Sequence, residues 1–151
     1  MSQELIQQSI PHRGPMLLLD EVVQMDTETI CCHKTFGSDE FFFQGHYPDN
    51  PLVPGVILCE CAAQTAAILL SNHHVDDSQI NGHVPVLTRM NKVRFKNTVH
   101  PGDKVEITVK HTETVSSAHF LTASIRKDGK LAASLELACT LAPKPAASDK
   151  V

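Results

Sequence analysis

The sequence of 151 residues has no tryptophan, one tyrosine and no large excess of either charge. Its 13 Lys and Arg against 17 Asp and Glu give a net charge of −4, which argues against a nucleic-acid binder or a polybasic membrane anchor. The first residues contain no basic region followed by an apolar run, so no secretory signal or transit peptide is visible, and we expect a cytoplasmic protein.

The sequence also lacks a disulfide framework and a nucleotide-binding loop. The five cysteines occur as an adjacent pair, a Cys-x-Cys and a single residue, a pattern that fits free thiols in a reducing compartment. Neither Cys31–His33 nor the His73-His74 pair has the spacing of a structural zinc site, so we expect no metal and no cofactor. The absence of a Gly-rich phosphate loop and of a Ser nucleophile elbow excludes the function classes that need them.

The longest apolar stretch, from Val56 to Leu70, is interrupted by Glu60, Gln64 and Thr65. Because this stretch has only 15 residues and contains those polar groups, we expect it to be too short and too polar to span a bilayer. Its apolar residues surround the helix axis, which is typical of a helix buried on all sides. The pattern predicts a buried helix over about residues 55–71.

Two short β-prone runs precede this helix, and nearly all of the chain after it is β-prone. These runs are Glu21–Gln24, Thr29–Phe36 and the region from Val84 onward. The Asp128-Gly129 pair between two alternating runs predicts a tight hairpin, and strands without intervening helices predict an antiparallel meander. We therefore predict an α+β fold in which an antiparallel sheet wraps around one long buried helix, as a single domain over residues 1–142 with a disordered tail at 143–151.

The helix contains a carboxylate that needs an explanation, because an isolated buried charge is costly. Gln64 lies one turn after Glu60 and can reach it, although the helix alone leaves open a solvent-facing Glu60. The preceding loop, stiffened by prolines, contains one histidine, His46. At the start of the helix, the amides of Gly55 and Val56 can donate to a developing negative oxygen. These residues offer a general base, a general acid and an oxyanion site.

The segment GHYPDNPLVPGVILCECAAQ resembles the signature of the FabZ-type 3-hydroxyacyl-[acyl-carrier-protein] dehydratases. In that family Gly-His-(aromatic)-Pro, a Pro-Gly pair that opens the helix, and Glu with Gln four residues later follow in this order. The likeness extends to IPHRGPMLLLD near the N-terminus and to NKVRFK with its Pro-Gly-Asp turn, and so covers about residues 10–141. Tyr47 stands where Phe is usual, and Asp49-Asn50 replace Gly-Lys. We expect His12 and Arg13 of the first segment to fix a loop.

The resemblance implies a hot-dog fold and dehydration of (3R)-3-hydroxyacyl-[acyl-carrier-protein] to the trans-2-enoyl product, in fatty-acid or related polyketide or polyene biosynthesis. His46 would remove the C2 proton, and Glu60, kept protonated by a pKa raised in apolar surroundings, would donate to the leaving oxygen. Gly55, with Val56, would polarise the thioester carbonyl, and Gln64 would orient Glu60. The resemblance also implies a homodimer with shared active sites, with a trimer of dimers as the larger alternative.

Basic residues gather between Arg89 and Lys110, where six Lys and Arg face two acids, a balance of 6 − 2 = +4. Four of them form a predicted docking surface for the acidic acyl carrier protein with its phosphopantetheine-linked chain, although an ordinary solvated strand face stays open. They are Arg89, Lys92, Arg94 and Lys96. Two other functions also stay open: a hot-dog acyl thioesterase, which would direct the carboxylate at water, and a non-catalytic dehydratase-like partner subunit.

Overall fold

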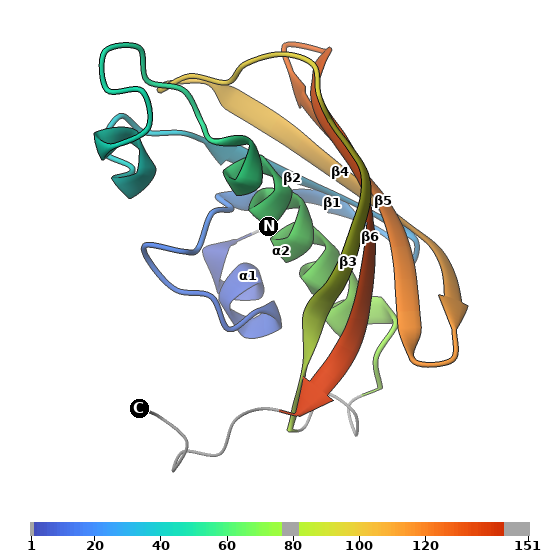
Figure 1. Cartoon of the computed structure of the whole chain (residues 1–151). Coiled ribbons are helices and arrows are strands. Elements are labelled where there is room, and N and C mark those ends of the chain that lie inside the picture. Colours follow the sequence, from blue (N-terminus) through green and yellow to red (C-terminus); the bar gives the residue numbers. More distant parts are fainter. Residues whose placement is uncertain (1, 77–81, 144–151) are drawn as a thin grey trace.

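The computed structural model describes residues 2–76 and 82–143. In that part of the chain, two α-helices and six strands occur in the order shown in Figure 1. They are α1 (Gln3–Ser9), β1 (Glu21–Met25), β2 (Thr29–Thr35), the short 3-10 helix η1 (Phe41–Gln44), α2 (Gly55–His73), β3 (His83–Phe95), β4 (Lys104–Val115), β5 (Ala118–Lys127) and β6 (Lys130–Pro143).

All six strands form one antiparallel sheet in the order β1-β2-β4-β5-β6-β3. The sheet curls around α2, which lies along its inner face (Figure 1). Apolar side chains of both layers meet in one core, which explains why α2 has almost no polar side. The predicted fold, an antiparallel sheet wrapped around a long helix in the hot-dog arrangement, is confirmed.

The helix α2 has 19 residues and ends at His73, two residues beyond the predicted 55–71. By length and composition alone it would suffice to cross a membrane, so the expectation that the segment is too short and too polar to do so was wrong. Most of the helix is buried inside the sheet, and this packing identifies it as the core helix of the fold.

The predicted meander is correct for β4, β5 and β6 and wrong for β3. The strand β3 pairs with β6 at one edge of the sheet, and β4 pairs with β2 and β5 in the middle. Two hydrogen bonds extend the pairing of β2 with β4 beyond the strand ends, since the Phe36 amide donates to the Asp103 carbonyl oxygen and the Gly102 amide donates to the Phe36 carbonyl oxygen. The predicted Asp-Gly hairpin is present: Asp128 and Gly129 have φ values of 50° and 77° between β5 and β6.

The N-terminal segment contains a helix that the sequence pattern did not predict. Ile6 of α1 is fully buried in the core, and α1 packs against α2. The Arg13 guanidinium donates to the carbonyl oxygens of Gln7, Ile10 and His12, so the predicted loop-fixing role of Arg13 is confirmed.

Cys32, Cys59, Cys61 and Cys139 pack as small buried side chains, as predicted for Cys59 and Cys61 on either side of Glu60. All five are free thiols. Burial raises the pKa of Cys139 to about 11 and, as the largest cause, that of Cys32 to about 12. Of the predicted tail, Pro143 is the last residue of β6, and residues 144–151 lie outside the described part of the chain.

Candidate active site

Glu60 lies in the second turn of α2, where its side chain is 29% exposed. The contact predicted from the four-residue spacing is present: Gln64 Nε2 donates to Glu60 Oε1 at 2.9 Å. Gln64 is 1% exposed, and its remaining hydrogen bonds join it to the segment before β1, with Nε2 donating to the Met16 carbonyl and Oε1 accepting from the Leu18 amide. A buried amide with all of these partners holds the carboxyl group in one orientation.

His12 also contacts this carboxyl group. Its Nε2 lies 3.3 Å from Glu60 Oε1, a contact that ties the loop of His12 to α2, as expected, and also places the imidazole at the carboxyl group. The Leu18 and Met16 contacts of Gln64 pin the loop that contains His12 against α2. No local pattern in the sequence connects the two residues, because the contact depends on this long-range packing.

The protonation expected for Glu60 needs a correction. Contact with His12 lowers the pKa of the Glu60 carboxyl below its ordinary value, burial opposes this shift, and the hydrogen bond from Gln64 adds to it. The expected rise in pKa was wrong, because hydrogen-bond donors to the charged form outweigh partial desolvation. By itself, Glu60 is therefore ionised at neutral pH.

His46 lies in the loop between η1 and α2 and is half-buried. Its Nδ1 is 3.1 Å from the Leu52 carbonyl oxygen. A carbonyl only accepts, so Nδ1 is the donor and the Nε2 of the neutral ring keeps its lone pair. The ring packs edge-on against Tyr47, with centroids 4.8 Å apart. In its neutral form His46 therefore presents Nε2 as the acceptor nitrogen.

The first turn of α2 leaves two amides free within the described part of the chain. The amides of Ile57 and Leu58 bond to the Pro54 carbonyl, whereas no hydrogen bond is recorded for those of Gly55 and Val56. The Phe95 ring lies against Gly55 so closely that a Cβ at that position would be 2.7 Å from Phe95 Cζ.

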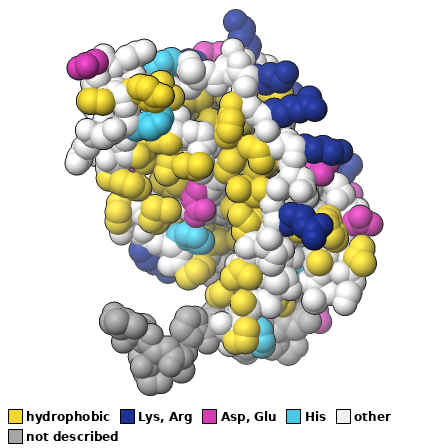
Figure 2. Space-filling model, viewed as in Figure 1, with side chains coloured by type: hydrophobic (Ala, Val, Ile, Leu, Met, Phe, Trp, Pro, Cys, Tyr) yellow, Lys and Arg dark blue, Asp and Glu magenta, His cyan; other side chains and the backbone are white. Residues whose placement is uncertain are grey.

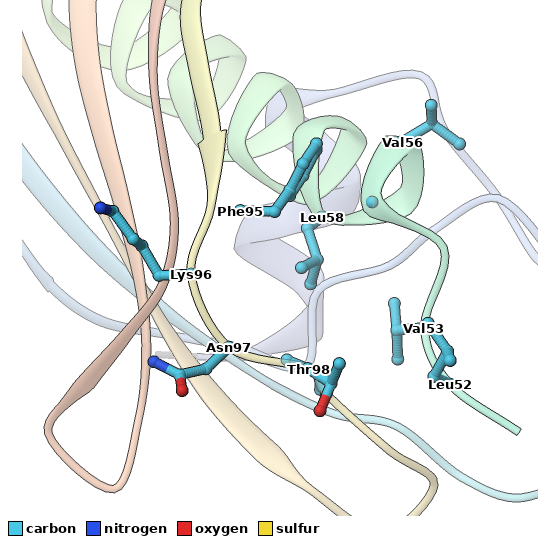
Figure 3. A pocket seen from close by; sticks show the side chains of 10 residues that line it. Leu52, Val53, Val56, Leu58, Phe95, Lys96, Asn97 and Thr98 are labelled. Atoms are coloured by element: carbon cyan, nitrogen blue, oxygen red, sulfur yellow. The ribbon is translucent and has the colours of Figure 1, made fainter. Parts of the chain in front are cut away.

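A pocket of about 410 Å³ opens beside this turn, between the loop before α2 and the end of β3 (Figure 3). Gly55, Val56 and Phe95 are among its lining residues, and Val56 is 72% exposed. The free amides therefore lie beside an open cavity.

Glu60 lines a different pocket, of about 280 Å³, together with His12 and Gln64. The rest of this pocket is mostly apolar, with lining from Ala63, Ala67, Val84–Leu87 and Cys139. His46 is not among the lining residues of either pocket, and the described part of the chain shows no contact between His46 and Glu60. Within the described part of one chain, Glu60 therefore contacts Gln64, and His46 lies outside the pocket that Glu60 lines.

The edge strand β3 is unusually exposed. Its nine residues from Leu87 to Phe95 are all exposed, and four of them are large and apolar, namely Leu87, Met90, Val93 and Phe95. Figure 2 shows hydrophobic side chains gathered in a broad area on the face that contains β3. An edge strand with a free backbone and apolar side chains is suited to pairing with another chain.

The four basic residues of the predicted docking surface are also exposed on β3 or directly after it. Lys92 Nζ is 3.4 Å from Glu136 Oε1, and Arg94 shares a shallow pocket with both. Lys96 lines the pocket at the start of α2. Figure 2 shows Lys and Arg side chains along the border beside the apolar area.

A second cluster of possible ligands lies on β2 and β4, where donor atoms of Cys31, His33 and Glu106 are within 4.8 Å of one another. The sheet register brings Glu106 opposite His33, which no sequence spacing could show. Arg126 stands opposite Glu106 in the register, and its positive charge opposes a cation there. We assign no metal to this cluster.

Comparison with known proteins supports a family assignment. The FabA-like domain model matches residues 10–136. The FabZ 3-hydroxyacyl-[acyl-carrier-protein] dehydratase of Clostridium perfringens is 38% identical over 132 residues, covering 87% of this chain and 92% of that protein. The FabZ enzyme of Streptococcus agalactiae is 37% identical over 129 residues, covering 85% and 89%. A solved structure, the dehydratase heterocomplex ApeI:P from Xenorhabdus doucetiae, shares the fold with a TM-score of 0.74 and 18% identity, covering 95% of this chain and 93% of that chain.

The wrapped sheet and the braced carboxyl group on its central helix, together with the FabA-like match, define a protein of the hot-dog dehydratase class. Within this class, the chain belongs to the FabZ family of 3-hydroxyacyl-[acyl-carrier-protein] dehydratases.

Proposed function

We propose that this protein dehydrates (3R)-3-hydroxyacyl-[acyl-carrier-protein] to the trans-2-enoyl form in fatty-acid biosynthesis. The observation that carries the proposal is the pair of prepared groups: a carboxyl group braced by Gln64 in a pocket, and His46 with its Nε2 lone pair free. Membership of the FabZ family gives the reaction and the carrier.

Each proposed role follows from the chemistry of the reaction. His46 Nε2 takes the C2 proton, which the thioester makes acidic, and Glu60 delivers a proton to the C3 hydroxyl group, which leaves as water. The amides of Gly55 and Val56 donate to the thioester oxygen as enolate character develops. Because the thioester supplies the acidity, the reaction needs no metal or redox cofactor.

The proposed active unit is a homodimer that shares its sites. Within the described part of one chain, His46 and Glu60 make no contact, so the two groups need a second chain to meet around one substrate. The exposed apolar edge of β3 provides the surface, since a second β3 can pair with it antiparallel and bury Leu87, Met90 and Val93. Such a dimer can assemble further into the trimer of dimers that the family resemblance implies.

The mostly apolar pocket beside Glu60 is the proposed acyl site. Arg89, Lys92, Arg94 and Lys96 form the proposed docking surface for the acidic carrier, whose phosphopantetheine arm would enter beside the start of α2. We further propose a single domain over residues 1–142 and a cytoplasmic location, which the five free thiols fit.

The proposal is tested with carrier-bound (3R)-3-hydroxyacyl chains of several lengths, by following the absorbance of the enoyl thioester. We expect dehydration without release of free carrier thiol. Thiol release from a saturated acyl thioester would instead identify a thioesterase. An inactive protein that binds an active dehydratase would identify a partner subunit.

A further inference from the structure

The proposed mechanism needs a proton on Glu60, yet the surroundings of Glu60 favour its charged form. Both His12 Nε2 and Gln64 Nε2 approach Glu60 Oε1, at 3.3 Å and 2.9 Å. Gln64 carries no titratable proton, whereas His12 does. The one feature that lowers the pKa of Glu60 most is therefore also a possible source of the missing proton.

We propose that His12 and Glu60 act as a dyad that stores one proton between them, and that His12 supplies, through Glu60, the proton which the leaving hydroxyl group takes. This inference rests on the proposed dehydratase function and deepens it. An imidazolium beside a carboxylate holds the same number of protons as a neutral imidazole beside a carboxylic acid. A shift of one proton across the 3.3 Å contact converts one form into the other.

The pocket around the dyad supports this role. His12 and Glu60 line the same cavity, so a substrate oxygen that reaches Glu60 lies beside His12 as well. The other titratable group in the lining is the Cys139 thiol of β6, whose pKa burial raises to about 11, and the β3 residues Val84–Leu87 carry no charge. Within the lining that a single chain supplies, His12 and Glu60 are therefore the groups able to pass a proton to a bound substrate.

Within the described part of the chain, Glu60 is the one carboxyl group that forms an ion pair with the His12 ring. His12 Nδ1 is buried and meets no hydrogen-bond partner in the part of the chain that the structure describes. His33, in contrast, has a carboxylate near each ring nitrogen, with Glu21 at 3.0 Å and Glu106 at 3.6 Å. A second carboxylate would stabilise the imidazolium, and its absence at His12 lets the ring release its proton to Glu60.

The step balances in protons and electrons. His46 Nε2 takes the C2 proton, the C2–H electron pair becomes the C2=C3 bond, and the C3–O bond breaks. The Nε2 proton of the His12 imidazolium passes to Glu60 Oε1, and the hydroxyl oxygen takes a proton from the Glu60 carboxyl group, so that Glu60 ends as a carboxylate and His12 as a neutral imidazole. His46 then holds one proton more and the dyad one fewer, and exchange with solvent restores both. His12 acts through Glu60 and is a positioning and proton-supplying residue.

The test compares kcat/KM of wild type and His12→Gln across pH, with a 3-hydroxyacyl pantetheine thioester. Glutamine keeps an N–H donor for Glu60 but holds no exchangeable charge. A carboxyl group without the imidazole loses its proton at lower pH than the dyad does. We therefore expect the ratio of variant to wild-type kcat/KM to fall as the pH rises from acidic to neutral, to about one hundredth at neutral pH, which is within the range of a lost general acid.

The matched control is His33→Gln, which removes a histidine from carboxylates outside the pocket and leaves the ratio near one at every pH. A ratio that is lowered but constant with pH would overturn the dyad and leave His12 with an orienting role only. Wild type without dehydratase activity would instead overturn the proposed function. Circular dichroism at each pH verifies that the variants stay folded, and His12→Asn is the second variant if His12→Gln does not.

Discussion

A dimer with shared sites makes a quantitative prediction for mixed subunits. Each chain supplies one His46 and one Glu60, and each site of the proposed dimer combines His46 of one chain with Glu60 of the other. His46→Ala alone and Glu60→Gln alone damage every site. A dimer of one His46→Ala chain and one Glu60→Gln chain contains one site with both native residues and one site with neither.

The mixed dimer should therefore show about half of the wild-type kcat per dimer. Each parent homodimer should lose activity by a factor of roughly 10²–10⁴, the range typical of a lost general acid or base. The activity of the mixed dimer then exceeds that of its parents by a factor of at least about 50.

The assay uses two chains with different affinity tags, produced together and purified on both tags, and follows formation of the enoyl thioester. A mixed dimer of two wild-type chains with the same tags sets the reference. Activity of the mixed dimer no higher than that of its parents would refute the shared site and would place His46 and Glu60 in one chain.

Three further predictions concern the helix start, the basic surface and the histidines at the far end of α2. Gly55→Ala places a Cβ 2.7 Å from Phe95 Cζ, so the amide of residue 55 should shift and kcat for dehydration should fall about 10–100-fold. The double variant Gly55→Ala with Phe95→Ala, which removes the clash, should recover part of the lost kcat. Arg94→Glu should raise KM for a carrier-bound substrate about tenfold at low salt and leave KM for a pantetheine thioester unchanged. Lys110→Glu, which reverses a charge outside the proposed docking surface, is the control. An equal effect of Arg94→Glu on both substrates would contradict carrier docking at this surface. Burial, with nearby His74, lowers the pKa values of His111 and His119 in the folded state, so the unfolded chain binds more protons and the stability of the fold should fall as pH drops through about 6.5. Thermal unfolding at pH 7.5 and 5.5 should therefore show a smaller loss of stability at the lower pH in His111→Gln than in wild type, and an equal loss would contradict this prediction.

Local patterns were sufficient to predict most of the secondary structure. The apolar stretch on all sides of α2 indicated a buried helix, and the alternating runs and the Asp128-Gly129 pair indicated β5 and β6 with their hairpin. The place of β3 was not predictable in this way. Its own residues fit a meander equally well, and the crossover consists in long-range pairing of β2 with β4 and of β3 with β6, which no local pattern specifies.

The candidate site divides in the same way. The spacing of Glu60 and Gln64 predicts their contact, because a helix turn brings residues four apart together. His12 and Glu60 meet only because the segment before β1 folds onto α2, and this contact reverses the expected direction of the Glu60 pKa. A pKa depends on the nearest donors and charges, which an apolar sequence context does not specify.

The exposed edge of β3 has a consequence for when the protein can work. A chain that has just folded presents a 13-residue edge strand, which is paired with β6 on one side only and carries exposed apolar side chains, a surface prone to unwanted pairing with other chains. If this edge also completes the catalytic site, the same contact protects the strand and creates the activity. A single chain is then inactive, and the specific activity falls as the protein concentration drops below the dissociation constant of the dimer.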